Sequence, residues 1–93
     1  MSNIESYTSV WDAIADTPEQ AANLRTRSEL MRQINAIVKD SGWTSTEAAQ
    51  RCGLTGPRML DLLDGRVSQF SLDALIDIAT AIGRRVHVEL KAA

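Results

Sequence analysis

Residues 44–65 constrain the fold of this 93-residue chain more than any other stretch. Thr44 can cap the N-terminus of a helix through Cys52, and Glu47, three residues later, would complete a capping box. Gly53 then supplies the left-handed backbone conformation in which a helix ends without steric cost. The spacing therefore predicts a short helix that stops at a glycine turn.

A second short helix is predicted directly after this turn. Thr55 is its N-cap, and Pro57 is tolerated in the first turn because amides there have no helical partner to lose. Gly65 closes the helix, whose inward side would carry Met59, Leu62 and Leu63. Two short helices joined by a glycine turn form a helix-turn-helix, whose second helix can enter the major groove of DNA.

The motif resembles that of the Xre/Cro family of helix-turn-helix proteins, which have the lambda-repressor-like fold. The shared residues are the small Ala49, the turn glycine Gly53, the inward Met59 and Leu62, and the closing Gly65. Residues 70–83 resemble the next helix of that family, and the flanking segments make the chain similar to small Xre-type antitoxins of HigA character. The resemblance implies an all-α, five-helix domain that binds an operator, represses its own operon and neutralises a co-encoded RelE-like toxin.

The rest of the chain supplies the other expected elements. Residues 9–15 can form a short helix, and Thr17 with Pro18 starts a longer one that continues to about Lys39. Ser71 caps a further helix, which ends at Gly83. We expect an acidic lead over residues 1–17, the helix-turn-helix domain over residues 18–83 and a dimerisation strand over residues 84–93.

Residues 86–90 alternate apolar and polar side chains, which predicts a short C-terminal β-strand. A lone strand leaves its backbone groups unpaired, so we expect antiparallel pairing across a homodimer, with two recognition helices ~34 Å apart. The helix predicted to end at Gly83 carries a second apolar stripe, which needs either the N-terminal helix or another protomer as a neighbour. The candidate dimer interface is Ala74, Ile78, Ala81, Val86, His87, Val88, Glu89 and Leu90, with His87 as an exposed spacer rather than a pH switch or metal ligand.

The candidate DNA contacts lie on the outward side of the second helix and around it. By family analogy Gly56, Pro57 and Asp61 would meet base edges, and Arg58 could donate to guanine or hold a phosphate. A glycine has no side chain to read a base, and acids on this face repel phosphates. The two helices could therefore serve protein contacts instead. The full set is Thr44, Ser45, Thr55, Gly56, Pro57, Arg58, Asp61, Arg66, Ser68 and Gln69.

The charge distribution predicts local rather than global attraction to DNA. The net charge is −2, and the first twenty residues hold four acids and no Lys or Arg, so the remaining 73 residues carry ten basic and eight acidic groups. Binding to double-stranded DNA should therefore be weak without a specific sequence, and sensitive to salt. In the acidic lead, Val10, Trp11 and Ile14 share one side and either anchor the lead to the core or bind a partner such as the toxin.

Other classes of protein find little support in the sequence. The single His and single Cys cannot make a zinc site by themselves, and the lone Cys excludes an internal disulfide framework. No phosphate-binding loop, nucleophile elbow or paired-carboxylate motif is present, so we expect no enzyme activity and no cofactor. With no signal peptide or membrane span, a cytoplasmic protein is expected. Two alternatives to the expected antitoxin remain. One is a plain regulator without a toxin, and the other is a protein-interaction module that no longer reads DNA.

Overall fold

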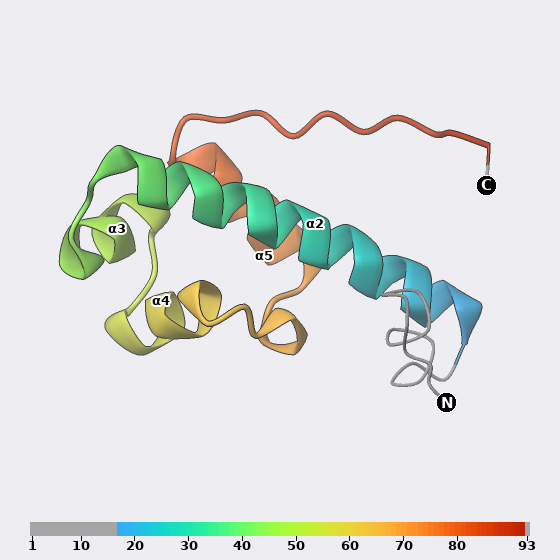
Figure 1. Cartoon of the computed structure of the whole chain (residues 1–93), viewed down its shortest axis with the longest axis horizontal. Coiled ribbons are helices and arrows are strands. Elements are labelled where there is room, and N and C mark those ends of the chain that lie inside the picture. The colour runs from blue at the N-terminus through green and yellow to red at the C-terminus, as the bar shows by residue number, and fades with distance from the viewer. Residues whose placement is uncertain (1–16, 93) are drawn as a thin grey trace.

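The computed structural model describes residues 17–92, which form an all-helical domain (Figure 1). Four α-helices are present in this part of the chain instead of the five expected, because the helix predicted over residues 9–15 lies outside the described residues. The elements in order are α2 (Pro18–Ser41), α3 (Ser45–Cys52), α4 (Gly56–Leu63), the 3₁₀ turn η1 (Val67–Gln69) and α5 (Leu72–Ala81).

The helix boundaries follow from hydroxyl caps and glycine stops. Thr17, Thr44, Thr55 and Ser71 each accept a hydrogen bond from the amide three residues on, at 3.1–3.3 Å. The capping box predicted at Thr44 is complete, and Gly53 ends α3 at φ 72°. The predicted limits of the helix-turn-helix are thereby confirmed, since each cap satisfies amides that the helix leaves without partners.

The long helix α2 crosses the whole molecule, and α4, η1 and α5 all pack against it (Figure 1). One face of α2 carries Met31, Ile34 and Val38 into the core. Small residues of α3 allow close packing of the helices, because Ala48 and Ala49 are buried. The largest fully buried side chains are Phe70, Ile34, Met59, Leu62 and Leu75. Within residues 17–92, no helix is long and apolar enough to cross a membrane.

Two expectations about the C-terminal third are corrected by the structure. The strand predicted over residues 86–90 is absent: residues 84–92 form no strand, because a single chain offers them no neighbouring strand to pair with. The second apolar stripe of α5 is largely covered within the chain. Ile78 is buried in the core and Ala74 is partly buried, because α5 packs against both α2 and α3. Only Ala81 of that stripe is exposed.

Candidate nucleic-acid interface

The turn between α3 and α4 fixes the direction of α4. The amide of Leu54 donates to the carbonyl of Ala49 at 2.9 Å, and the amide of Gly53 donates to that of Gln50 at 3.2 Å. Met59 and Leu62 are then buried beneath α4, at 1% and 0% exposure. Because these two side chains fill the core, the opposite side of α4 must face solvent.

That outward side of α4 combines exposed apolar residues with Asp61 and, at the C-cap, Asp64. Gly56 and Pro57 are exposed in its first turn, and Leu60, one turn later, is 57% exposed. Leu60 lies on the exposed side predicted from helical spacing, yet it is absent from the candidate DNA contacts, in which Pro57 is the apolar side chain. Its signal in the sequence is its place opposite Met59 and Leu62.

Arg58 points toward η1 and away from this apolar surface. Its Nη1 donates to the carbonyl of Gln69 at 2.8 Å, and its guanidinium lies 4.1 Å from the ring centroid of Phe70. A guanidinium over an aromatic face is attracted by the ring quadrupole, and here the ring belongs to a buried core residue. Arg58 therefore connects α4 to η1, and its place differs from that of a side chain extended toward a base.

A second arginine holds the same turn from the other side. Arg27 of α2 donates through Nη1 to the carbonyls of Val67, at 3.3 Å, and Phe70, at 3.0 Å. Its Nε donates to Asn23 at 2.6 Å, which fixes the guanidinium on α2. The predicted DNA contacts Ser68 and Gln69 are exposed on a turn whose shape these two arginines determine.

The acids predicted on α4 are paired with Arg66. The Nε of Arg66 lies 3.6 Å from Asp61 and 3.7 Å from Asp64. The Arg66 side chain is 62% exposed, so water screens both pairs and the guanidinium can exchange a carboxylate for a phosphate. Asp61 therefore lies beside a positive charge in the free protein, at ion-pair rather than hydrogen-bond distance.

The N-terminus of α3, a predicted phosphate position, already holds a carboxylate. Glu47 accepts a hydrogen bond from the amide of Thr44 at 2.9 Å, while the Thr44 hydroxyl accepts one from the amide of Glu47 at 3.1 Å. Ser45 and Thr55 are exposed, but the Thr55 hydroxyl likewise accepts from the amide of Arg58. These hydroxyls cap helices first, and a phosphate would meet them from their solvent side.

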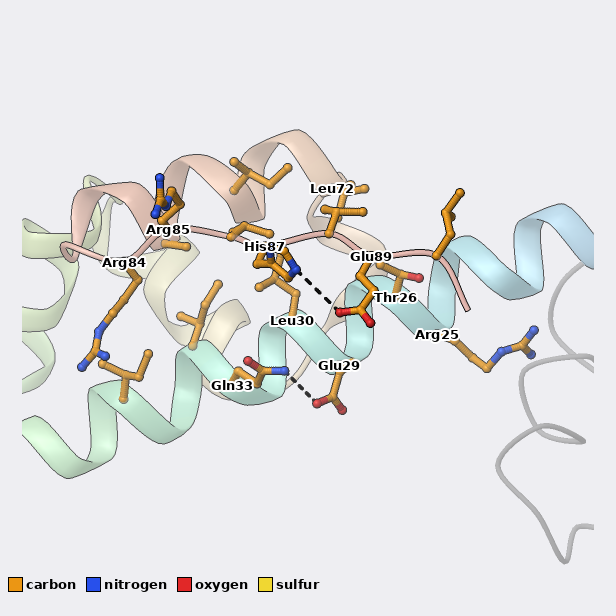
Figure 2. Close-up of a pocket in the computed structure, with 17 residues that line it drawn as sticks. Arg25, Thr26, Glu29, Leu30, Gln33, Leu72, Arg84, Arg85, His87 and Glu89 are labelled. Carbon is orange, nitrogen blue, oxygen red and sulfur yellow. Dashed lines mark hydrogen bonds and ion pairs between the residues drawn. The ribbon is translucent and has the colours of Figure 1, made fainter. Parts of the chain in front are cut away.

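A second surface lies between α2 and α5. Of the residues expected to pair two copies, Val86 to Leu90 line it, whereas Ala74, Ile78 and Ala81 do not. A groove of about 710 Å³ has a largely apolar floor, and residues 84–90 run along it (Figure 2). Val86 packs partly against the core, whereas Val88 and Leu90 are 77% and 97% exposed. His87 lies 3.6 Å from Glu89 and both are exposed, as expected for a polar side. The floor is formed by Leu30, Ile34, Ile37, Leu72, Ile76 and Ala79.

The two surfaces lie on opposite sides of α2. Figure 1 shows α4 and η1 below this helix and residues 84–92 above it. The predicted partner-binding residues Val10, Trp11 and Ile14 lie outside the described residues. Within residues 17–92, no three His, Cys, Asp or Glu side chains gather to hold a metal ion. The Cys52 thiol is buried in the core, and this burial raises its pKa.

A buried helix pair with an outward second helix defines a helix-turn-helix domain. A family model described as a helix-turn-helix domain matches residues 13–91, and the chain belongs to this family. A comparison with curated proteins gives no significant match. Membership of the family suggests a DNA-binding regulator, and α4 with η1 is the part of the structure that such a function would use.

Proposed function

We propose that the chain is a sequence-specific transcriptional regulator of the Xre/Cro type, which binds a palindromic operator and represses its own operon. The observation that carries the proposal is the fixed relation between α4 and η1. Arg58 and Arg27 bind the carbonyls of this turn from two sides, so an exposed helix and an exposed polar turn are presented together. A recognition helix with an adjacent phosphate-contacting turn needs this kind of preorganisation.

The regulator would act as a homodimer joined through residues 84–92. Within residues 17–92, Arg84 is the last residue with a backbone hydrogen bond, so the segment after it offers free amides and carbonyls to a second copy. Antiparallel pairing would satisfy these groups and cover Val88 and Leu90. This interface lies on the side of α2 opposite α4, so it would leave both recognition helices free.

The finer role we propose is that of a HigA-type antitoxin, which neutralises a co-encoded RelE-like toxin. The support is the resemblance in sequence, together with an acidic lead suited to a basic partner. Co-expression with the neighbouring open reading frame tests this role. A small basic protein that co-purifies and regains ribonuclease activity on separation would support it. A neighbour that neither binds nor cleaves RNA would leave a plain regulator.

DNA binding is tested by fluorescence anisotropy against a labelled duplex of the chain's own upstream region, with a scrambled duplex as control. Both are titrated at two salt concentrations, because phosphate contacts release counterions and weaken as salt rises. Arg66→Ala should weaken binding and lower the salt slope by about one unit. Arg66→Lys keeps the positive charge and should retain most of the salt slope, which separates the loss of a phosphate contact from other effects of the substitution. Equal affinity for the two duplexes would contradict sequence-specific binding.

A further inference from the structure

We propose that α4 reads its operator through an apolar surface, formed by Pro57 and Leu60 beside Gly56, that contacts thymine methyl groups. Leu60 is then the specificity-determining residue of the recognition helix. The inference rests on the proposed DNA-binding function and goes beyond it, because it states the chemistry of the bases that the helix selects.

Of the polar side chains on α4, Arg58 is committed to other contacts and Asp61 is only partly exposed. Arg58 donates to the carbonyl of Gln69 and stacks on Phe70, so recruiting it to guanine would break both contacts. Asp61 pairs with Arg66 at 3.6 Å, and its side chain is only 32% exposed. Readout of guanine by Arg58 would therefore cost contacts that hold α4 to η1, and readout of cytosine would depend on a partly buried carboxylate beside Arg66.

The apolar residues, in contrast, are free and point outward. Met59 and Leu62 fill the core, so Pro57 lies on the opposite side of α4, with Leu60 beside it one turn later. Within residues 17–92, the exposed large hydrophobic side chains are those of Leu60, Val88 and Leu90. Leu60 is the one that lies on a helix, and no other segment of the described chain covers it.

Gly56 gives this surface close access to the bases. A Cβ added there would meet no atom within 4 Å, so the first turn of α4 has open space around it. Because glycine adds no side chain, the helix backbone and the Pro57 ring can approach the floor of the major groove closely. In that groove the C5-methyl of thymine is the apolar group that a base pair presents.

The exposed polar groups of η1 and Arg66 would orient this contact without specifying sequence. Ser68 and Gln69 are exposed beside α4, and the guanidinium of Arg66 is largely accessible. Contacts of this type to phosphates set the position of the helix, while base selection comes from the groove. The expected half-site is therefore rich in thymine at the positions that face Pro57 and Leu60.

The test begins with selection of bound duplexes from a random pool by the purified full chain. Each thymine of the enriched site is then replaced by deoxyuridine, which removes the methyl group and keeps the base pair. We expect a roughly fourfold loss of affinity at each contacted thymine, the equivalent of ~0.8 kcal/mol for one buried methyl. Deoxyuridine outside the half-sites serves as the control duplex.

Leu60 variants assign the contact to this residue. Leu60→Ala should bind the thymine duplex more weakly and lose its sensitivity to deoxyuridine at the thymine that Leu60 contacts, while sensitivity at the thymine that faces Pro57 remains. Leu60→Met should retain the sensitivity at both. Both variants should unfold like the parent in urea, because Leu60 is exposed.

An enriched site that ignores deoxyuridine at every position would overturn apolar readout while DNA binding stood. Sensitivity that persists unchanged at every thymine in Leu60→Ala would assign the methyl contacts to other residues and overturn the role of Leu60. Failure of the pool to enrich would contradict DNA binding itself, and would favour a protein partner on the apolar surface of α4.

Discussion

The two sides of α2 differ in how many of their backbone groups and apolar side chains find partners within the chain. On the α4 side, the carbonyls of Val67, Gln69 and Phe70 all accept hydrogen bonds from arginine side chains. On the other side, residues 85–92 make no backbone hydrogen bond within the described chain and leave Val88 and Leu90 exposed. The chain thus organises its proposed DNA surface alone, whereas its groove surface keeps exposed apolar side chains and backbone groups without partners among the described residues.

This difference separates two kinds of surface residue. Side chains on the α4 side that look available for binding, such as Arg58, also hold the fold together. Side chains on the groove side, such as Val88, contribute little to the isolated chain. A substitution on the first side should therefore change stability and binding together, whereas one on the second should change association alone.

The largest effect is expected where the DNA surface meets the core. Phe70→Ala removes a ring that is 1% exposed and lies under the Arg58 guanidinium, so it should lower the free energy of unfolding by about 3–5 kcal/mol. Urea denaturation followed by circular dichroism measures this. Leu90→Ala is the matched control on the groove side, and its unfolding at a concentration where the chain is monomeric should be unchanged. Equal losses of unfolding free energy in the two variants would contradict the difference between the two sides of α2.

Arg27→Ala should have the next largest effect, although Arg27 belongs to α2 and not to the DNA surface. Its loss removes the donor for two carbonyls of η1 and should cost about 1–3 kcal/mol of stability. Operator affinity should fall as well, because η1 loses its fixed shape. Arg32→Ala removes a charge of the same kind from an exposed position of the same helix and is the control. A destabilised variant with full operator affinity would show that η1 makes no contribution to binding.

Val88→Asp should act on association and spare the monomer. A charge at a side chain that is 77% exposed costs the isolated chain little, but a paired strand would bury it in both copies. We expect the dimer Kd to rise at least tenfold, or about 1.4 kcal/mol, by sedimentation equilibrium. Val88→Ile should leave the Kd close to that of the parent. A parent that sediments as a monomer at micromolar concentration would contradict strand pairing directly.

The smallest effect concerns the exposed face of α2. Hydrogen bonds from Arg32 and Gln33 hold the pKa of the Glu29 carboxyl at about 2, below its ordinary 4.5. Because the folded pKa is lowered, the stabilisation is present above pH 4.5 and disappears as the pH falls through about 2. The group is exposed to water, so Glu29→Gln should cost no more than ~0.5 kcal/mol at pH 7. Urea midpoints of the two proteins should converge by pH 2, and a constant gap would contradict the pairing.

The sequence was sufficient for the local rules of the helix-turn-helix. The hydroxyl caps, the stop at Gly53 and the inward Met59 and Leu62 depend on residues a few positions apart, and the structure confirms them. The hydrogen bonds of Arg58 and Arg27 to the carbonyls around η1 could not be predicted in this way. They depend on where the carbonyls of η1 point, which is decided by the packing of α2, α4 and Phe70.

The predictions for the groove side were wrong for a related reason, because they too depended on contacts between distant segments. Periodicity correctly gave α5 two apolar sides, but whether Ile78 meets α3 or a second copy depends on tertiary packing, and here it is buried in the chain's own core. Alternation over residues 86–90 marks side chains suited to a strand, yet a strand exists only where a neighbouring backbone supplies its partners. A single chain contains no such partner for this segment within its described residues.

Gly56 has a consequence for how regulators of this kind could diverge. Its backbone does not adopt the left-handed conformation, and an added side chain would meet open space, so the position can accept mutation without strain. Replacing a glycine whose backbone conformation suits other residues also stabilises the fold by about 0.4–1 kcal/mol, because it lowers the entropy of the unfolded chain. A new specificity could therefore arise at Gly56 at no cost in folding. After duplication of the gene, a single substitution at Gly56 could give the two proteins different operator sequences, without a compensating change elsewhere.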